Sequence, residues 1–495
     1  MDSPETATPK PTYLLARWLF LRGLALVFAI AFVSLFVQID GLVGSRGILP
    51  IADFLTAVRR ATGGAVVAQL PTLCWFAASD ASLHLQCAAG ILLSIALFVG
   101  FAPRLCLVLL WALYLSLVVA GQEFLSFQWD VLLLETALFA IAFAPGTWLS
   151  GLARERPPSN ASRWLLLWLL FRLMFASGVV KLTSGDACWW DLSALRFHYW
   201  SQPIPTVFAW YAAHLPLWFQ KFSCALMYAI EIGLPFLIFG TRRMREIACA
   251  GLVFFQLLIA LTGNYGFFNL LTLLLCLPLL DDAFLARFVP RGLAQRASAP
   301  REERRTWAPL SIAGIVAAWA VAIFTGAKLL ENVGLLERVP QPLETLEQTI
   351  APFRSLNDYG LFRVMTKERR EIEIQGSDDG VAWKTYPFRW KPGDVDRAPV
   401  WVAPHMPRLD WQMWFAALGP PRRSRWFAPL LDRLLEGSPD VLGLFAENPF
   451  PDHPPREVRA VQFSYRFTTS EERSASAAWW NREELGLFVP PRGRR

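Results

Sequence analysis

Residues 164–182 read Trp-Leu-Leu-Leu-Trp-Leu-Leu-Phe-Arg-Leu-Met-Phe-Ala-Ser-Gly-Val-Val-Lys-Leu, an apolar run whose only charges are Arg172 and Lys181. A bilayer core about 30 Å thick is crossed by roughly 20 mostly apolar residues in a helix. The run is therefore predicted to span a membrane. Its two charged residues are costly inside a membrane, so they are candidates for a specific role.

Eight further segments resemble this run, and the chain is 54% hydrophobic and only 18% charged, where a soluble protein carries about 25% charge. The seventh and eighth are short and joined by residues 262–266, so they can form a re-entrant pair. Apolar runs stop near Ala327. The sequence predicts a multi-pass α-helical membrane bundle with about seven to nine crossings over residues 1–330, followed by a soluble α+β domain over residues 331–495. The nine segments begin at about Trp18, Leu83, Leu105, Trp129, Trp164, Phe222, Ile247, Phe267 and Leu310.

The net charge of +7 comes mostly from arginines beside apolar segments, which is typical of topology determinants and not of nucleic-acid binding. If the N-terminus is cytoplasmic, fifteen Lys and Arg residues flank the inner ends of the segments and six flank the outer ends. The positive-inside rule therefore predicts a cytoplasmic N-terminus and an extracytoplasmic C-terminal domain. No small-residue cleavage site follows the first segment, so we expect it to be retained as an anchor.

The spacing of the cysteine and histidine residues does not support a metal site. None of the seven cysteines lies beyond Cys276 and none forms a Cys-x-x-Cys pair, while His198 and His214 have no third ligand at a useful spacing. We therefore predict no zinc site, no disulfide framework and no cofactor. The redox role of Cys188 stays open, because it depends on exposure beside a cation.

Charged residues near the outer ends of the predicted helices form the first candidate site. Gln128, Asp130 and Glu135 open the fourth segment, and Arg172 in the fifth is the candidate counter-ion for Glu135. Charged groups in lipid are expensive and normally find partners inside a bundle. A structural ion pair is favoured over a catalytic or ligand-binding role, and both interpretations stay open.

Lys181 ends the fifth segment and precedes Cys188 and the pair Trp189-Trp190. The favoured interpretation is that its ammonium group reaches the lipid headgroups. The alternative is a partly buried lysine whose pKa is lowered, which makes it a usable base.

A polar stretch over residues 198–206 contains two prolines two positions apart. We expect an extended loop there, followed by a short amphipathic helix at the membrane interface. The polar side chains of this region either share an outward-facing cavity or lock the bundle through hydrogen bonds. They are His198, Tyr199, Gln202, His214, Glu231, Asn264 and Asn269.

The C-terminal part alternates in a way that predicts strands over residues 360–365, 371–375, 381–386 and 457–468. Residues 376–380 indicate a tight turn, and helices are expected near residues 411–418 and 426–435. The pattern is typical of an α+β domain with an antiparallel sheet or sandwich. Some of its many tryptophans must lie in the core, yet so many in one domain also suit a surface that grips apolar or partly folded partners. They are Trp390, Trp401, Trp411, Trp414, Trp426, Trp479 and Trp480.

Several runs resemble the lipase maturation factor family, and the resemblance covers nearly the whole chain. Two of them are long enough to be specific: residues 198–206 with the Ala-Trp-Tyr and His-Leu-Pro that follow, and residues 403–418, Ala-Pro-His-Met-Pro-Arg-Leu-Asp-Trp-Gln-Met-Trp-Phe-Ala-Ala-Leu. Shorter similar runs are residues 44–50, 124–130, 365–369 and 448–451.

The resemblance implies a multi-pass protein of the endoplasmic reticulum membrane that assists folding and assembly of secreted homodimeric lipases. The family's lumenal region is assigned client recognition, which agrees with the outside placement expected here. The Arg-, Ala- and Pro-rich composition looks bacterial, and in a bacterium the host would be the inner membrane.

A weaker similarity links the region around Lys181 to the helical membrane domain of vitamin K-dependent carboxylases, where a lysine at the matching place is the active base. It implies Lys181 as base, with His198 or Glu135 nearby.

The sequence thus favours a non-enzymatic, chaperone-like maturation factor that contacts the bilayer and, through its C-terminal domain, a secreted lipase-like client. A membrane-embedded enzyme acting through Lys181 is the alternative. The oligomeric state and the client do not follow from the residues. Candidate client- or ligand-binding residues are Gln128, Asp130, Arg172, Tyr199, Gln202, His214, Glu231, His405, Asp410, Trp411 and Trp414.

Overall fold

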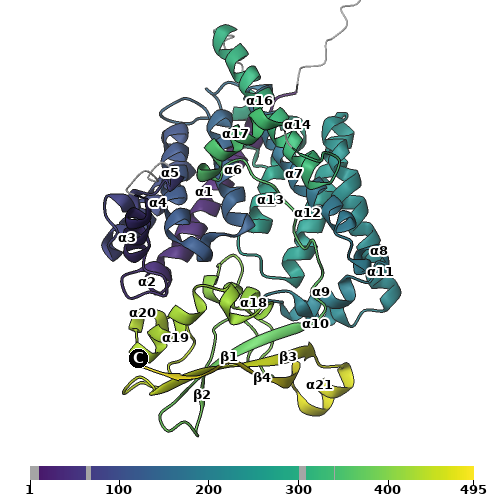
Figure 1. Ribbon diagram of the computed structural model, residues 1–495. Coiled ribbons are helices and arrows are strands. Elements are labelled where there is room, and N and C mark those ends of the chain that lie inside the picture. The colour runs from purple at the N-terminus through teal and green to yellow at the C-terminus, as the bar shows by residue number, and fades with distance from the viewer. Residues whose placement is uncertain (1–10, 63–68, 300–307, 339, 495) are drawn as a thin grey trace, which may run out of the picture.

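The computed structural model describes residues 11–62, 69–299, 308–338 and 340–494, and it shows a helical body that carries a sheet at one end (Figure 1). We call residues 11–332 the helical body and residues 369–494 the sheet domain; residues 333–368 are the connecting segment. Of the residues tallied for topology, Lys10, Arg301, Arg304 and Arg305 lie outside the described ranges.

Among the described residues, seven helices are long and apolar enough to cross a membrane. This agrees with the predicted multi-pass bundle, and the chain is an integral membrane protein. The seven are α1 (Leu14–Phe36), α4 (Asp80–Val99), α5 (Pro103–Ala120), α7 (Asn160–Thr183), the span Leu217–Phe239 built from α11 (Leu217–Tyr228), η4 (Ala229–Gly233) and η5 (Leu234–Phe239), α12 (Arg242–Thr262), and Gly314–Asn332 within α16 (Ala308–Asn332).

Two shorter apolar helices complete the body. They are α6 (Gln128–Phe143), and α13 (Phe268–Cys276), which continues into η6 (Leu277–Leu279). The prediction of a short seventh segment is wrong, because α12 has 21 residues and reaches full spanning length. Its first turn is rich in arginine, so a prediction based on apolar residues places the start of the helix too late.

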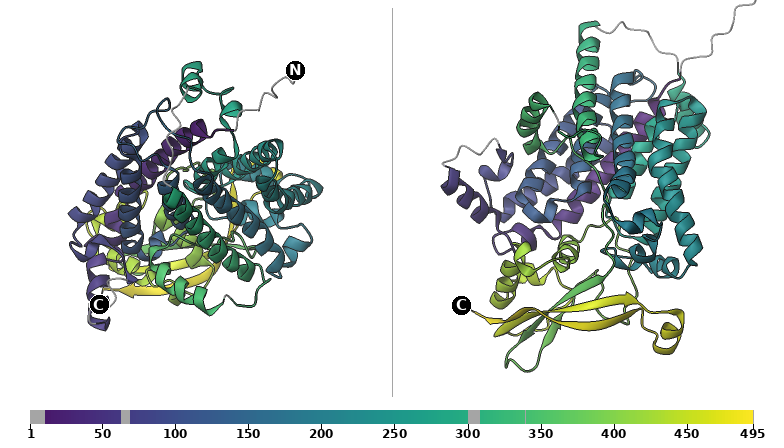
Figure 2. Two further views of the ribbon diagram at one scale, coloured as in Figure 1. Left: turned by 90° about the horizontal axis from the view of Figure 1, so that it is seen from above. Right: turned by 45° about the vertical axis from the view of Figure 1, so that its right-hand side comes forward.

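The ends of the helices gather at two opposite ends of the body. At one end, Leu14 N in α1 donates to Asp282 at 3.0 Å. At the other, Met406 N of the sheet domain donates to Ser34 Oγ near the end of α1 at 3.0 Å. The start of α1 and the sheet domain therefore lie at opposite ends of the body, as Figure 2 also shows.

Short helices fill the connections of the body and the sheet domain. Their bounds are α2 (Ile39–Val43), α3 (Ile51–Thr62), η2 (Leu73–Trp75), η3 (Gln122–Leu125), α8 (Ala187–Trp190), α9 (Leu195–Ser201), α10 (Val207–Ala213), α14 (Asp282–Leu285), α15 (Arg291–Ala297), α17 (Gln341–Ile350), η7 (Ala351–Phe353), η8 (Pro421–Arg423), α20 (Pro439–Leu442) and α21 (Ser470–Ser476).

The sheet domain contains one antiparallel sheet of four strands in the order β2-β1-β3-β4. The strands are β1 (Arg369–Ser377), β2 (Lys384–Tyr386), β3 (Glu457–Phe467) and β4 (Trp480–Gly493). Helices α18 (Arg408–Ala417) and α19 (Phe427–Glu436) lie between the sheet and the helical body (Figure 1). The α+β prediction is confirmed as a single sheet and not a sandwich.

One strand prediction is wrong, and one strand was missed. Residues 360–365 form no strand, because the connecting segment packs against the helical body: Gly360 lies against Val180, and the Phe362 ring meets Tyr265. Strand β4 was not predicted. Its charged first half and its pair Pro490-Pro491 hide the alternation that a half-buried strand normally shows.

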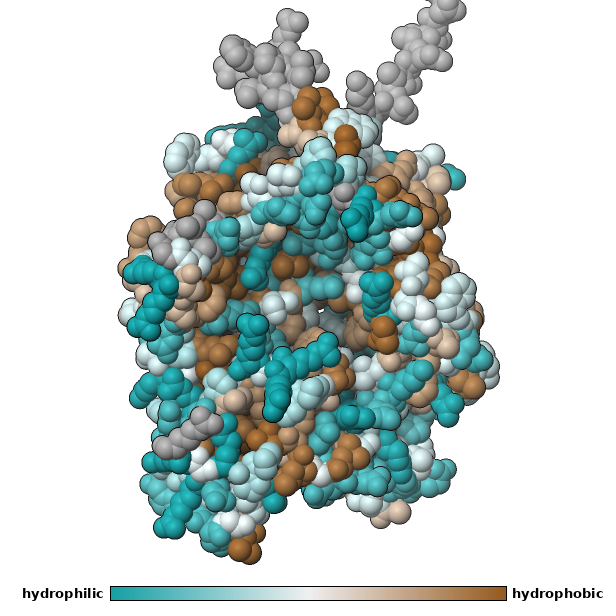
Figure 3. All heavy atoms as spheres, viewed as in Figure 1, coloured by the Kyte–Doolittle hydropathy of each residue, from teal (hydrophilic) through white to brown (hydrophobic). Residues whose placement is uncertain are grey.

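Hydropathy follows this division. On the face seen in Figure 3, hydrophilic residues cover most of the lower part, over the sheet, whereas hydrophobic residues gather along both flanks of the upper part, over the helices. One continuous buried core runs from α1 and α6 of the body into α18, α19 and β1 of the sheet domain. The two parts are therefore packed against each other as one structure.

Candidate functional site

A buried ion pair joins the sheet domain to the helical body. Arg408 in α18 donates to both carboxylate oxygens of Asp130 in α6, at 2.5 and 2.8 Å, and Tyr114 OH donates to the same carboxylate at 2.6 Å. Both charged side chains are shielded from solvent. A two-point contact of this kind fixes orientation as well as distance. Asp130, a predicted binding residue, is thus an attachment point for the sheet domain.

Glu135 lies further along α6 and pairs with Arg172 of α7, the counter-ion predicted for it. Its other oxygen accepts hydrogen bonds from Tyr359 OH at 2.7 Å and from Asn357 N at 3.1 Å, both in the connecting segment. Arg172 also donates to the Asn357 carbonyl at 2.9 Å. The arrangement is a structural ion pair that reaches two helices and the segment leading to the sheet domain.

Lys181 is buried and donates to Glu231 Oε2 at 2.5 Å and to the Ser177 carbonyl at 2.9 Å. Glu231 belongs to η4, a π-helical turn, and such turns often occur at functional sites. Gly178 allows the close approach, since a Cβ there would lie 2.6 Å from Ile232 Cγ1. The prediction that Lys181 reaches the headgroups is wrong, because Glu231 gives it a buried partner.

His198 lies in α9 beside the loop between α12 and α13. Tyr265 OH of that loop donates to Gln202 Oε1 at 2.7 Å and lies 3.4 Å from His198 Nε2. Burial and, second, the charge of Lys181 lower the pKa of His198 to about 4, so the imidazole is neutral at pH 7. Burial also raises the pKa of Tyr199 to about 12. The extended loop predicted from residue 198 is wrong in part, since α9 continues to Ser201.

Asn264 and His405 form further attachments between the two parts. Asn264 Oδ1 accepts from the backbone N–H groups within residues 400–403 at 2.8 and 2.9 Å, and its Nδ2 donates to the carbonyl of Val400 at 2.8 Å. His405 Nδ1 lies 3.0 Å from Ser34 Oγ. Burial and the nearby Arg408 lower the pKa of His405.

The remaining polar candidates contact other partners. Asn269 Nδ2 donates to Gln256 Oε1 at 2.9 Å, and His214 Nδ1 lies 2.6 Å from the Trp210 carbonyl. Gln128 begins α6, and its buried side-chain oxygen has no hydrogen-bond partner among the described residues. Most of the candidates therefore have hydrogen-bond partners, and they are distributed over several hydrogen-bonded groups.

Trp411 and Trp414 were predicted as client-binding candidates on an exposed surface, but both side chains are buried. Trp411 is 4% exposed, and its ring packs against Trp129 with the centroids 4.8 Å apart. Trp414 Nε1 donates to the Ser201 carbonyl at 2.8 Å. Both are buried because α18 turns this face toward the helical body. Of the tryptophans proposed as a surface, Trp426 and Trp480 are also buried.

Asp410 and Arg369 are structural as well. Asp410 Oδ1 accepts from the backbone N–H groups of Trp390 and Lys391, each at 2.9 Å, and burial raises its pKa. Arg369 at the start of β1 donates to Glu371 at 2.6 Å and to the Pro203 carbonyl at 2.8 Å.

Sequence reasoning missed Arg369 and Arg408. Arg369 ends the run 365–369 and Arg408 lies in the run 403–418, and both runs carry the family resemblance. A signal was therefore present in the sequence for both residues.

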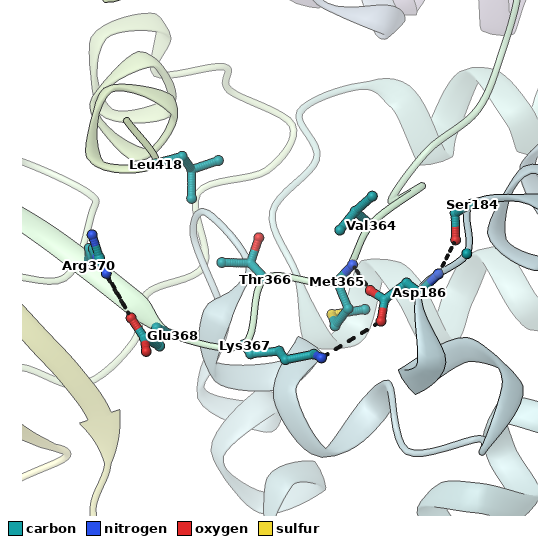
Figure 4. Close-up of a pocket in the computed structure, with 10 residues that line it drawn as sticks. Ser184, Asp186, Val364, Met365, Thr366, Lys367, Glu368, Arg370 and Leu418 are labelled. Atoms are coloured by element: carbon teal, nitrogen blue, oxygen red, sulfur yellow. Dashed lines mark hydrogen bonds and ion pairs between the residues drawn. The ribbon is translucent and has the colours of Figure 1, made fainter. Parts of the chain in front are cut away.

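An open pocket of about 630 Å³ lies where the end of α7 meets the segment leading to β1 (Figure 4). Asp186 in its wall accepts from Met365 N at 2.7 Å, and Lys367 Nζ lies 3.9 Å from the same carboxylate. Arg370 pairs with Glu368 on the opposite side. The pocket lining includes none of the predicted site residues.

Within the described ranges, no group of three His, Cys, Asp or Glu side chains is placed to hold a metal ion. The seven cysteines are free and buried. Cys188 is therefore not an exposed thiol.

Two family models match this chain. The lipase maturation factor transmembrane domain matches residues 15–287, and the lipase maturation factor C-terminal domain matches residues 355–490. The boundary between them falls in and around α16 and the connecting segment. No solved structure shows a significant match.

Similar relatives extend over both parts of the chain. Lipase maturation factor 2 of Gallus gallus is 37% identical over 96% of this chain and 81% of its own length. Lipase maturation factor 1 of Bos taurus is 35% identical over 98% of this chain and 90% of its own length. Lipase maturation factor 2 of Homo sapiens is 36% identical over 96% of this chain and 82% of its own length. The chain belongs to the lipase maturation factor family.

Proposed function

We propose that this chain is a membrane-anchored maturation factor that assists the folding of exported lipases. The observation that carries the proposal is the match to the family over both the helical body and the sheet domain. The relatives that share both parts are named lipase maturation factors. A secreted lipase is accordingly the client that this chain would act on.

The sheet domain would face the extracytoplasmic side, where exported proteins fold. Support comes from the excess of Lys and Arg at the opposite end of the body, for example Arg17, which pairs with Glu155 beside the start of α1. In an animal cell the protein would lie in the endoplasmic reticulum membrane with its sheet domain in the lumen. The inner membrane of a bacterium, with a periplasmic sheet domain, stays a prediction from composition.

The client would contact the sheet domain on β4. This edge strand has β3 on one side, and Leu485 and Leu487 in it are 51% and 55% exposed. An edge strand leaves one row of backbone N–H and C=O groups unpaired, which an extended segment of another chain can bond, and the exposed Leu485 and Leu487 would add apolar contact. A partly folded lipase presents such segments, whereas a folded one has buried them.

A non-enzymatic role fits the way the candidate charges are used. Lys181 is paired with Glu231, Arg172 with Glu135 and Asp130 with Arg408. Each pair holds helices, or the two parts, together.

Replacing Lys181 and Glu231 by an apolar pair separates this role from catalysis. A buried ion pair can often be exchanged for apolar side chains of similar volume at little cost. The double variant Lys181→Met, Glu231→Leu should therefore increase the specific activity of a co-expressed secreted lipase by the same factor as the unaltered chain. Loss of that effect, at unchanged membrane level and melting temperature, would favour the enzyme alternative.

A further inference from the structure

We propose that Trp401 of the sheet domain inserts into the membrane interface, so that the sheet domain contacts phospholipid directly as well as through its attachments to the helical body. The contact would be made by a surface that also includes α10 and the start of α11. Three observations support it: the height of residues 400–403 relative to the spans, the neighbours of Trp401, and its exposure.

The backbone on either side of Trp401 is fixed at the level where a span ends. Asn264 follows α12 by two residues, and its side chain accepts from Val402 N at 2.8 Å and donates to the Val400 carbonyl at 2.8 Å. A hydrogen bond at each side leaves little freedom along the membrane normal. The indole of Trp401 is thus held beside the end of a membrane-spanning helix.

The nearest aromatic neighbour of Trp401 leads directly into another span. The rings of Trp401 and Phe208 meet edge-on, with centroids 6.4 Å apart. Phe208 lies in α10, which ends four residues before Leu217, the first residue of the span Leu217–Phe239. Figure 1 shows α10 at the end of the helical body that meets the sheet. Trp401 is therefore level with the ends of two spans.

Helix α10 has two apolar faces that meet different surroundings. Trp210 is buried and packs edge-on against Trp479 of the sheet domain. Phe208 and Tyr211, three residues apart on its other face, are exposed, as is Leu215 just beyond its end. Because the first face packs against the sheet domain, the second face is free to contact another apolar environment.

The exposure of Trp401 and of its neighbours indicates that this apolar environment is a lipid bilayer. Trp401 is 52% exposed and is the one exposed tryptophan among the described residues of the sheet domain. Along the chain, exposed apolar residues continue into α11, the start of the span Leu217–Phe239, at Leu217, Trp218 and Phe222. Tryptophan and tyrosine favour the headgroup level of a bilayer, where the ring is apolar and the N–H or O–H stays hydrated. Continuity with a membrane-spanning surface therefore identifies a bilayer as the partner.

Photolabelling of the unaltered full-length chain tests the proposal. The chain would be placed in phosphatidylcholine vesicles that contain a phospholipid with a photoactivatable group near its headgroup, irradiated, and digested with trypsin. Lipid adducts are expected on residues 398–408, which include Trp401, and on residues 197–221, which include Trp218. Residues 371–384, which include the 82% exposed Val381, serve as the control and should stay free of lipid.

Single introduced cysteines give a second readout, because the seven native cysteines are buried. Trp401→Cys and Trp218→Cys, each labelled with an environment-sensitive fluorophore, should both lose emission when the vesicles contain spin-labelled lipid, whereas Val381→Cys should not. Lipid-free residues 398–408 together with a Trp401→Cys signal that matches Val381→Cys would overturn the proposal. Crosslinking of residues 398–408 to a second protein chain in place of lipid would overturn it as well.

Discussion

At the scale of single residues, two ion pairs join the same two parts of the molecule but differ in burial. Arg408 with Asp130 is shielded from solvent, whereas Arg46 with Asp440 leaves the Arg46 side chain 62% exposed. Removing one partner of a buried pair leaves an uncompensated charge and costs about 3–5 kcal/mol. An exposed pair contributes about 1 kcal/mol or less.

We therefore predict that Arg408→Ala lowers the free energy of unfolding by about 3–5 kcal/mol. Thermal unfolding in detergent, followed by circular dichroism, measures the change. Arg46→Ala is the matched control and should cost under about 1 kcal/mol. Equal melting temperatures for the two variants would contradict the role given to the buried pair.

His198 should make stability depend on pH. Its pKa is about 4 in the folded chain, against an ordinary 6.5. Between these values the unfolded chain binds more protons, so stability is greatest above pH 6.5 and falls as the pH drops toward 4. The loss at pH 5 is expected to be at most about 2 kcal/mol, reduced by residual exposure of the ring.

Melting temperatures at pH 7 and pH 5 give the measurement for His198. His198→Gln should reduce the difference between the two temperatures. His453→Gln, at a side chain that is 64% exposed, should leave it unchanged. If both variants behave alike, His198 is not the group responsible.

The partner of Glu135 could be predicted, whereas the partner of Lys181 and the burial of aromatic residues could not. Glu135 and Arg172 are charges in apolar segments, and lipid leaves such groups few alternatives to pairing. Trp411 and Trp414 suit an exposed client surface and a packed junction equally well, because tryptophan is common in both. Only the orientation of α18 decides between them.

At the scale of elements, α7 approaches η4 closely at Gly178. A Cβ at this position would meet Ile232 Cγ1 at 2.6 Å and Glu231 Cβ at 3.0 Å. We predict that Gly178→Ala separates the two elements and lowers the free energy of unfolding by about 1–3 kcal/mol. Gly326→Ala in α16, whose new Cβ would have ordinary contact with Trp168 at 3.6 Å, should be neutral or slightly stabilising. A Gly178→Ala melting temperature equal to or above that of Gly326→Ala would refute the close contact.

Long apolar helices could be predicted because hydropathy over about 20 residues reports membrane crossing directly. Strands gave a weaker signal. β3 alternates and was predicted, whereas residues 360–365 carry apolar side chains that pack on the helical body and so resemble a strand in sequence alone. The register of β1 with β3 pairs residues that are 80 to 96 positions apart, such as Arg369 and Tyr465, and no local pattern specifies it.

At the scale of the whole molecule, the division into helical body and sheet domain followed from composition, but their attachment did not. Arg408 and Asp130 are separated by 278 positions in the chain. Nothing within either segment identifies the other as its partner. The fold class is thus accessible from sequence, while the junction requires the three-dimensional arrangement.

Orientation in the membrane gives a further prediction. Val381 lies in the sheet domain and Ala153 in the loop at the other end of the body, and both are exposed. In sealed microsomes, Ala153→Cys should react with a membrane-impermeant maleimide, whereas Val381→Cys should react only after detergent is added. The reverse labelling pattern would contradict the proposed orientation in the membrane.

We propose that the chain matures lipases through its sheet domain. The specific activity of a secreted homodimeric lipase, per molecule secreted, would be measured in cells without a maturation factor of their own, with and without the full-length chain. The chain should raise that activity, and the variant Leu485→Lys, Leu487→Lys should not, because added charge blocks an edge strand without disturbing buried contacts. A specific activity that is unchanged by the correctly inserted, unaltered chain would contradict the account.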